Sequence, residues 1–366
     1  MHRVQNMGSV LQAYALQYKI KQLGYESELI NYAFPPAKEK QFGLKDLVSW
    51  GWDMIHGFPE KKRKKKIEEF RTRFLSCSEK TYDRSLLLSE PPQYDLYCTG
   101  SDQVWNPFHV GEDTSFMMDF APVDSPRIAY ASSFATREVE EPYFSLYAKY
   151  LSRYREITVR EESGVGIIKQ MIDKEALVVC DPTLLLSSEE WGGLADSSTL
   201  RAPKGYILIY LLGYMFNPRP GFYGIVDKVS KALKLPVYIV NPFASDSVKH
   251  NIKAIKGAGP ADFVRLFKEA SFVVTDSFHG AAFATIFNVP MIGVVKDFNN
   301  GDGRISTLRS KVGGDNSIWC HSSPFTMREG EKDLFRCDPS KVNNLRTYST
   351  NVLKRMIENN INDEHN

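Results

Sequence analysis

Three polar side chains, Asp276, Ser277 and His279, follow an apolar run in the second half of the chain. The run at 272–275 is typical of a buried strand, and the apolar residues at 280–287 predict a helix directly after the turn. In α/β sheets, ligands bind at the carboxyl ends of parallel strands. His279 would lie at a helix N-terminus, where free N–H groups favour an anion and an imidazole can transfer a proton. A histidine that only caps the helix would show the same pattern, so both interpretations stay open.

Two arginines occupy positions suited to binding an anion. Arg160 ends the predicted strand 157–160, and a guanidinium there can bind a phosphate or carboxylate through two parallel hydrogen bonds. The alternative is a surface ion pair with the glutamates that follow it. Arg304 opens a predicted helix after the Gly-rich loop 299–303, where it could supply a second cation or simply be a solvated helix start. Ser277 and the N–H of Gly280 add hydrogen-bond donors to this predicted anion site.

A second group of residues has the types found on carbohydrate-binding surfaces. Asp102, Gln103 and Trp105 place an acid, an amide and an aromatic ring on one loop after a predicted strand. Asn6 and Gly8 precede a predicted helix, where Asn6 could bind a sugar hydroxyl and Gly8 permits close approach of the backbone. The alternatives are an ordinary N-cap for Asn6 and core packing for Trp105.

Strands alternate with helices along most of the chain, which predicts an α/β fold with parallel sheets. Residues 9–23 form the first predicted helix, which Gly24 ends, and only 1–5 precede it, so the sequence suggests that the chain begins inside a first strand. Residues 34–82 interrupt the alternation as an insertion. Strands are predicted at 28–32, 95–99, 127–131, 157–160, 176–180, 206–212, 236–240, 272–275 and 291–295, and later helices at 141–154, 162–171, 221–233, 260–270, 280–287, 304–312 and 345–359.

The length of 366 residues favours two domains. We expect an N-terminal Rossmann-like domain at 1–194 on the acceptor side of a cleft and a C-terminal Rossmann-like domain at 195–340 on the donor side. A final helix with a tail is expected at 341–366. The hinge is expected near 187–194.

Composition excludes several classes of protein. Forty-six basic and 44 acidic residues give a net charge of +2, which points to neither nucleic acid nor a membrane. The 5 cysteines form no CxxC pair, so a disulfide framework and a zinc site are not expected and a reducing cytosol fits. No apolar run is long enough to span a bilayer, and the N-terminus has no apolar leader. The basic run 61–66 predicts a solvated helix start rather than a polyanion site.

Five segments, in this order, resemble the polysaccharide pyruvyl transferase family. They are NMGSVLQAYALQ (6–17), TGSDQVWNP (99–107), ITVREESGVGII (157–168), CDPTLLL (180–186) and TDSFHGAAFATIF (275–287). The resemblance extends to about the helix at Arg304 and implies a GT-B-like fold, in which two Rossmann-like domains face each other across a cleft. It also implies transfer of the enolpyruvyl group of phosphoenolpyruvate to a sugar, with formation of a pyruvate ketal and release of phosphate.

For that chemistry, the resemblance makes His279 and Arg160 the catalytic candidates, with Ser277, Arg304 and Gly280 binding the donor. Asn6, Gly8, Asp102, Gln103 and Trp105 would bind the acceptor. The chain departs from the family at one position, because better-known members carry an arginine two residues before the histidine, where this chain has Ser277. Arg304 or Lys296 is the candidate replacement for that charge.

The expected protein is a cytosolic enzyme of a bacterial-type capsule or exopolysaccharide pathway, with phosphoenolpyruvate as co-substrate and neither cofactor nor metal. A lipid-linked oligosaccharide acceptor would bring it to the inner membrane surface without anchoring it. Two alternatives remain at this stage: a GT-B-like glycosyltransferase that uses a nucleotide sugar, and a non-catalytic glycan-binding relative.

Overall fold

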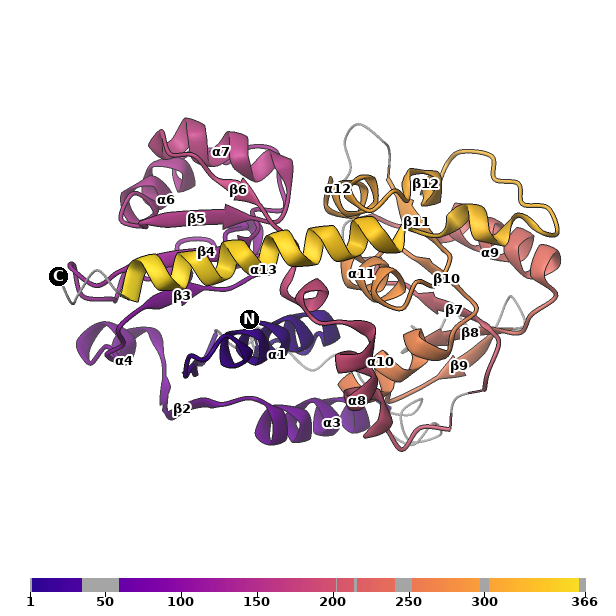
Figure 1. The fold of residues 1–366 in the computed structure, drawn as a ribbon, viewed down its shortest axis with the longest axis horizontal. Coiled ribbons are helices and arrows are strands. Elements are labelled where there is room, and N and C mark those ends of the chain that lie inside the picture. The colour runs from indigo at the N-terminus through magenta and orange to yellow at the C-terminus, as the bar shows by residue number, and fades with distance from the viewer. Residues whose placement is uncertain are drawn as a thin grey trace, which may run out of the picture.

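The structure, a computed structural model, describes residues 2–34, 59–201, 203–213, 216–240, 252–296 and 303–361. Within these residues the chain forms two lobes, each containing a parallel sheet with helices packed beside it (Figure 1). The α/β prediction with parallel sheets is therefore confirmed. Residues 35–58 of the predicted insertion and 299–302 of the loop before Arg304 lie outside the described residues.

The first lobe contains a sheet of 4 strands in the order β3-β4-β5-β6. Its strands are β3 (Tyr97–Thr99), β4 (Arg127–Ser132), β5 (Glu156–Val159) and β6 (Leu177–Val178). Its helical segments are α4 (Arg84–Ser89), α5 (Pro107–Val110), η1 (Thr114–Met117), α6 (Tyr143–Leu151) and α7 (Glu162–Ile172). All positions of β4 are buried, as expected for a central parallel strand.

The second lobe contains a sheet of 6 strands in the order β12-β11-β10-β7-β8-β9. Its strands are β7 (Ile207–Tyr210), β8 (Val237–Val240), β9 (Lys253–Ile255), β10 (Phe272–Thr275), β11 (Met291–Val295) and β12 (Ile318–Cys320). Its helical segments are α9 (Arg219–Leu233), α10 (Pro260–Glu269), α11 (Phe278–Ile286), α12 (Gly303–Lys311), η3 (Asp315–Ser317) and η4 (Glu331–Phe335). The fully buried β10 lies between β7 and β11, so the turn after it opens at the middle of the sheet.

Besides α4, four elements precede β3 and lie outside the two larger sheets. They are α1 (Met7–Gln22), β1 (Leu29–Tyr32), α3 (Pro59–Phe74) and β2 (Cys77–Tyr82), with β1 and β2 paired in parallel. Gly24 has a φ of 92°, which confirms that the first helix ends in a left-handed residue. The basic run begins α3 and is mostly exposed, with Lys66 paired to Asp262 at 2.6 Å, so the prediction of a solvated helix start is confirmed.

Two segments join the lobes. After β6 the chain forms η2 (Pro182–Leu185) and α8 (Ser188–Asp196), and the predicted domain boundary after residue 194 falls inside α8. The side chain of Trp191 in α8 packs on Phe283 of α11, with ring centroids 4.9 Å apart. The last helix, α13 (Pro339–Ile361), starts beside the second lobe and runs back along the first (Figure 1).

One continuous core cluster contains residues from both lobes and from α13. It joins Leu11 of α1 and Tyr130 of β4 to Phe263 of α10 and Leu353 of α13. None of the helices in the described part of the chain is both long and apolar enough to cross a bilayer.

Candidate active site

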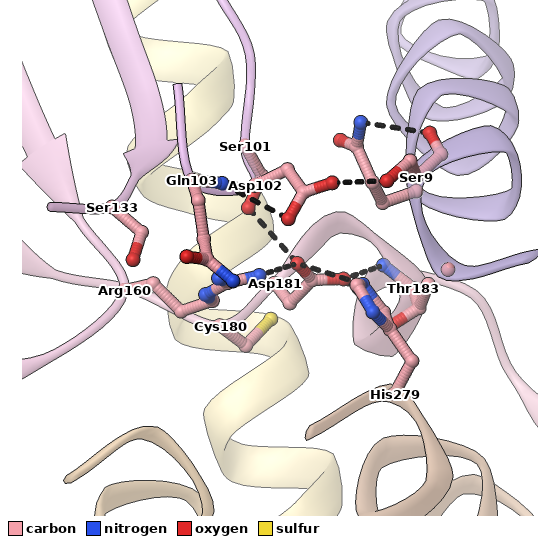
Figure 2. Close-up of polar contacts among 12 residues, drawn as sticks. Ser9, Ser101, Asp102, Gln103, Ser133, Arg160, Cys180, Asp181, Thr183 and His279 are labelled. Carbon is pink, nitrogen blue, oxygen red and sulfur yellow. Dashed lines mark hydrogen bonds and ion pairs between the residues drawn. The ribbon is translucent and has the colours of Figure 1, made fainter. Parts of the chain in front are cut away.

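Charged side chains from both lobes converge on the carboxylate of Asp181 (Figure 2). Arg160 Nη1 donates to Asp181 Oδ2 at 2.9 Å, and His279 Nε2 lies 3.8 Å from the same oxygen. The second contact is too long for a hydrogen bond and becomes an ion pair when the imidazole is protonated. The structure therefore brings together the two residues, Arg160 and His279, that the sequence proposes as catalytic.

The backbone delivers each of these side chains from the end of a parallel strand. Arg160 directly follows β5, and Asp181 follows β6 and caps η2 by accepting from the N–H of Thr183 at 3.0 Å. His279 lies in the first turn of α11, and Ser277 caps that helix. The site lies at the strand ends because the carboxyl ends of parallel strands meet along one edge of each sheet.

Asp181 remains ionised because its carboxylate is fully hydrogen-bonded. Oδ2 also accepts from Ser101 Oγ at 2.9 Å, and Oδ1 also accepts from Thr183 Oγ1 at 2.7 Å. Burial by itself raises the pKa of Asp181, but the neighbouring His279 and Arg160 outweigh it, so the pKa lies well below its usual value. A permanent negative charge thus holds the guanidinium and the imidazole in place.

Arg160 has hydrogen-bonding capacity that the described protein does not use. Its side chain is buried, with 3% of the residue exposed, yet neither Nε nor Nη2 finds a hydrogen-bond partner among the described residues. Glu161 Oε2 lies 3.9 Å from Nε, beyond hydrogen-bond distance, and the ring of Phe278 lies 4.4 Å from the guanidinium carbon. Buried donors of this kind are costly unless a ligand satisfies them, and their fork geometry matches a phosphate or a carboxylate.

Arg304 brings a second guanidinium close to the first. It is 7% exposed, so the alternative of a solvated helix start is wrong. The pKa of Arg304 is lowered to about 10, because burial disfavours its charge and Arg160 adds a like charge nearby, while Glu161 and Asp102 act in the opposite direction. Two like charges held within electrostatic reach favour the binding of an anion between or beside them.

The imidazole of His279 packs directly against the backbone of α1. A Cβ atom at Gly8 would lie 2.0 Å from His279 Nδ1, so only glycine fits there. On the opposite side of the ring, Nε2 has no hydrogen-bond partner among the described residues, and the residue is 8% exposed. The sequence suggests that Gly8 contacts a sugar directly. In the structure, Gly8 instead shapes the site through its contact with His279.

Asp102 adds a second buried carboxylate to the site. Its Oδ2 accepts from Ser9 Oγ, and its Oδ1 accepts from the N–H of Gln103 at 2.9 Å (Figure 2). The residue adopts a φ of 80°, a strained conformation for a side chain other than glycine. Burial raises the pKa of Asp102, but His279 and Arg160 together outweigh it, so the net shift is downward. Asp102 is thus a second buried carboxylate within electrostatic reach of the same imidazole.

Two proposed acceptor residues have structural roles instead. The prediction for Trp105 is wrong, because its side chain is fully buried, donates to the carbonyl oxygen of Phe116 at 3.2 Å and packs on Phe134 with centroids 5.3 Å apart. Asn6 caps α1 by accepting from the N–H groups of Gly8 and Ser9, as the alternative interpretation stated. Gln103 is partly exposed, and its side-chain oxygen Oε1 accepts a hydrogen bond from Asn106 Nδ2 at 2.8 Å. Among the described residues, its side-chain nitrogen has no hydrogen-bond partner.

Two proposed donor residues are also explained by local structure. Ser277 Oγ accepts from the N–H of Gly280 at 3.4 Å, so the hydroxyl caps α11 and that N–H is not directed at a ligand. A Cβ atom at Gly280 would lie 2.3 Å from Thr275 Oγ1, so this glycine is required for packing. Donor binding by Gly280 stays a prediction. Lys296, the other candidate for the replacement charge, lies exposed after β11.

Sequence analysis missed several members of the site. These are Ser9, Ser101, Glu161 and Thr183. For Asp181, which precedes Pro182, the sequence favours a turn and leaves a part in shaping the cleft as the alternative. One signal was available: Asp181 lies between a strand and Pro182, at the same kind of strand end as Arg160. No three His, Cys, Asp or Glu side chains among the described residues are grouped so that they could hold a metal ion.

An exposed aromatic pair, Phe108 and His109, lies in α5, directly after the loop that holds Trp105. Phe108 is 89% exposed, and the rings of Phe108 and His109 lie 5.3 Å apart. The pKa of His109 is lowered by partial burial of its ring and by the charge of Arg304, against the opposing charge of Asp102. These influences place the pair within electrostatic reach of the charged cluster.

Comparisons with known proteins bear on the family and the fold of the chain. The family model described as polysaccharide pyruvyl transferase matches residues 6–297. The structure of UDP-GlcNAc 2-epimerase from Methanocaldococcus jannaschii is similar at 12% identity and a TM-score of 0.50, over 93% of this chain and 90% of that one. The S. aureus MnaA-UDP co-structure is similar at 10% identity and a TM-score of 0.51, over 96% and 87%. At these identities the likeness shows the fold alone, and it confirms the GT-B-like architecture. No curated protein matches the chain.

Proposed function

The chain belongs to the polysaccharide pyruvyl transferase family, and on that premise we propose that it transfers the enolpyruvyl group of phosphoenolpyruvate to a sugar. The acceptor belongs to a surface polysaccharide or to its lipid-linked precursor. The product is a pyruvate ketal, and inorganic phosphate is released.

The observation that carries this proposal is the buried guanidinium of Arg160, which has two nitrogens without hydrogen-bond partners among the described residues and lies next to an unpartnered imidazole nitrogen. Phosphoenolpyruvate carries a phosphate and a carboxylate on neighbouring atoms. Arg160 and Arg304 supply two cations for these two anionic groups. Arg304 also offers the charge that Ser277 does not, where better-known family members carry an arginine.

The reaction needs one proton on carbon and two new carbon–oxygen bonds. Protonation of C3 converts the vinyl group into a methyl group, and a sugar hydroxyl adds to C2 as it loses its proton. The C2–O bond to phosphate breaks, and a second hydroxyl closes the ketal at the same carbon. Of the two hydroxyl protons, one ends on the methyl carbon and the other on phosphate, so no oxidant or reductant is required.

His279 is the proposed proton-transfer group. Its Nε2 faces Asp181 Oδ2 at 3.8 Å, and a carboxylate at that distance stabilises the imidazolium that forms when the ring accepts a proton. Asp102, on the other lobe, lies close enough to act on the same ring electrostatically. An imidazole near one carboxylate and within electrostatic reach of a second can take a hydroxyl proton at one step and return a proton at another.

The acceptor side of the proposal uses different residues from those that the sequence suggested. The partly exposed Gln103 has amide hydrogens for sugar hydroxyls, and the exposed ring of Phe108 offers an apolar face for a sugar ring. Asn106 orients both, because it donates to Gln103 Oε1 at 2.8 Å and accepts from the N–H of Phe108 at 3.0 Å.

The test measures phosphate released from phosphoenolpyruvate with and without an extract of lipid-linked oligosaccharides, and identifies a pyruvylated product by mass. We expect acceptor-dependent release, and His279→Ala should lower it by at least 1000-fold, on the order of what a lost proton-transfer group and its contacts contribute. His321→Ala, a partly exposed histidine in the second lobe, is the matched control. Thermal stabilisation by sugar nucleotides but not by phosphoenolpyruvate would instead support a glycosyltransferase. Binding of the oligosaccharide without any release of phosphate would support a glycan-binding protein.

A further inference from the structure

Glu161 is a buried carboxylate of the site to which the proposed mechanism gives no role. It directly follows Arg160 and is 2% exposed. Its Oε1 accepts three hydrogen bonds from the segment after β4: from Ser133 Oγ at 2.8 Å, from the N–H of Phe134 at 3.1 Å and from the N–H of Ala135 at 3.2 Å. Its Oε2 has no hydrogen-bond partner among the described residues. One oxygen of this carboxylate is thus fixed by three donors, and the other is left for a ligand.

The turn that holds Oε1 is shaped around this contact. Ala135 has a φ of 52°, a left-handed conformation that is strained for alanine, and its N–H also donates to Ser133 Oγ at 3.1 Å. This conformation lets the N–H groups of neighbouring residues point at one carboxylate oxygen. The direction of Oε2 is therefore set by the turn.

The free oxygen of Glu161 lies beside the free donors of Arg160. Oε2 is 3.9 Å from Arg160 Nε. Nε and Nη2 present parallel N–H groups on one side of the guanidinium, away from the Nη1–H that binds Asp181. A phosphate oxygen about 2.8 Å from Nε can also lie within hydrogen-bond distance of Oε2. Because both oxygens carry negative charge, they can share that space only with a proton between them.

The charges of the whole cluster favour the same conclusion. Two guanidiniums and three carboxylates, all buried, lie within electrostatic reach of one another: Arg160, Arg304, Glu161, Asp181 and Asp102. The ring of His279 adds a positive charge only when it is protonated. A doubly charged phosphate thus enters a cluster in which carboxylates already outnumber guanidiniums. Repulsion between buried charges is strong, so binding of the phosphate favours the uptake of a proton.

We propose that Glu161 takes up a proton when the phosphate of the donor binds to Arg160, and that it gives this proton to the phosphate when the C2–O bond breaks. The inference rests on the proposed function. The phosphate rather than the carboxylate of phosphoenolpyruvate is the partner, because a phosphate monoester has a second pKa of about 6 and can share a proton at neutral pH.

The protons and electrons of this step balance. The electron pair of the C2–O bond passes to the phosphate oxygen, the O–H bond of Glu161 breaks, and its proton ends on the phosphate. The second sugar hydroxyl then forms its bond to C2 and loses a proton to the solvent. That proton replaces the one that Glu161 took up, so the net reaction is unchanged and Glu161 is again a carboxylate.

Burial keeps the shared proton from exchanging with water. Glu161 and Arg160 are no more than 3% exposed, and the ring of Phe278, on the second lobe, lies 4.4 Å from the guanidinium carbon. α11 therefore has to shift when the donor enters. In the closed arrangement, the proton on Glu161 can move only to the ligand.

The first experiment counts protons with the variant Glu161→Gln. Its side-chain oxygen can still accept from the turn, while an NH2 group replaces Oε2 and cannot accept a proton. Calorimetry of phosphoenolpyruvate binding near neutral pH, in two buffers with different ionisation enthalpies, gives the number of protons taken up. We expect the variant to take up about one proton fewer than the wild type, so its donor affinity should fall about 10-fold less per pH unit above neutrality.

The matched control is Glu162→Gln, the same change at the next residue. Glu162 is largely exposed and pairs with Lys311 at 2.9 Å, and such a surface pair contributes little. This variant should take up as many protons as the wild type.

The second readout separates catalysis from binding. We expect Glu161→Gln to lower kcat for acceptor-dependent phosphate release at least 100-fold, on the order of the contribution of a general acid. The Kd for phosphoenolpyruvate near neutral pH should stay the same or decrease, because the amide removes a like charge beside the phosphate. A purely structural role would weaken donor binding together with kcat.

Equal proton uptake by the wild type and Glu161→Gln would overturn the role of Glu161 and leave the proposed function in place. If Glu161→Gln fails to fold, His279→Gln decides the outcome: it should still take up the proton of Glu161, and the absence of uptake would overturn the inference. If the wild type does not bind phosphoenolpyruvate at all, the proposed function fails and this inference fails with it.

Discussion

At the scale of single residues, the site depends on charges that burial makes strong. Arg160, Arg304, Asp181 and His279 are each less than a tenth exposed, so water screens their interactions little. Their types were readable from the sequence, but their pairing was not. The sequence offered Glu161 and Glu162 as partners of Arg160, whereas its hydrogen bond goes to Asp181, 21 residues away.

Arg160→Lys tests the role of the guanidinium fork. Lysine keeps the positive charge beside Asp181 but cannot present two parallel donors to a phosphate or carboxylate. We expect the KM for phosphoenolpyruvate to rise at least 10-fold, with a smaller effect on the KM for the acceptor. Arg265→Lys, on the outer side of α10 and paired with Glu269 at 3.3 Å, is the control. An unchanged donor KM would remove Arg160 from the binding site.

His2 should make the stability of the fold depend on pH. Burial lowers the pKa of His2 to about 3, assisted by the positive charges of Arg71 and Arg3. The folded chain therefore keeps the ring neutral while the unfolded chain protonates it below about pH 6.5, so stability is present above that pH and falls as the pH drops towards 3. Between pH 7 and pH 5 we expect a loss of about 2 kcal/mol in the free energy of unfolding.

Urea unfolding of the wild type and of His2→Gln at both pH values measures this loss. The variant should depend less on pH by that amount, while His321→Gln should behave as the wild type. Identical slopes for the wild type and His2→Gln would show that another group causes the pH dependence.

At the scale of elements, strand ends and helix starts position the site. Asp102, Arg160, Asp181 and His279 follow β3, β5, β6 and β10, respectively, within a few residues. Asp181 and Ser277 cap the helical turns that come after β6 and β10. Periodicity located these elements to within a few residues. It missed β9 and β12, each 3 residues long, because such short edge strands carry too few apolar residues to show a period.

Gly8→Ala tests the contact between α1 and α11. The added Cβ would lie 2.0 Å from His279 Nδ1, so either the ring or the start of α1 must move. We expect kcat to fall at least 100-fold with a smaller change in donor KM, since Arg160 remains in place. Gly166→Ala in α7, where a Cβ would meet nothing within 4 Å, should keep full activity and stabilise the fold by about 0.5–1 kcal/mol. Wild-type kcat in Gly8→Ala would contradict the proposed placement of the imidazole.

At the scale of the whole molecule, α13 fastens the last part of the chain to the first lobe. Ser349 is fully buried and accepts from the N–H of Cys180 at 3.0 Å, next to Asp181. Further along the helix, Asn360 Nδ2 donates to Glu156 Oε1 at 3.2 Å. α13 thus contacts and stabilises the segment after β6 that carries Asp181.

Ser349→Ala should leave the N–H of Cys180 buried without an acceptor, at a cost of about 1–3 kcal/mol. We expect a lower Tm by calorimetry and a single transition, because one core cluster joins the two lobes. Thr347→Ala, on the exposed side of the same helix, should change the free energy of unfolding by no more than about 0.5 kcal/mol. Two separate transitions in the wild type would show that the lobes unfold independently.

The sequence by itself determined the class of fold, the order of the main strands and helices, and the identity of His279, Arg160 and Arg304 as candidates. These features follow from local patterns: apolar periodicity, capping residues and polar side chains at strand ends. The resemblance of five segments to the family also predicted the GT-B-like architecture. The order of these segments can be read along the chain without any knowledge of contacts.

Only the tertiary structure decided which candidates meet. Trp105 and Phe108 lie 3 residues apart, yet the first is buried and the second is 89% exposed, because Asn106 caps the short helix α5 that begins between them and carries Phe108. Asp181 became the centre of the site because residues from three strand ends and two helices surround it. Burial and pairing across such separations depend on how the lobes pack, and no local pattern of residues encodes that packing.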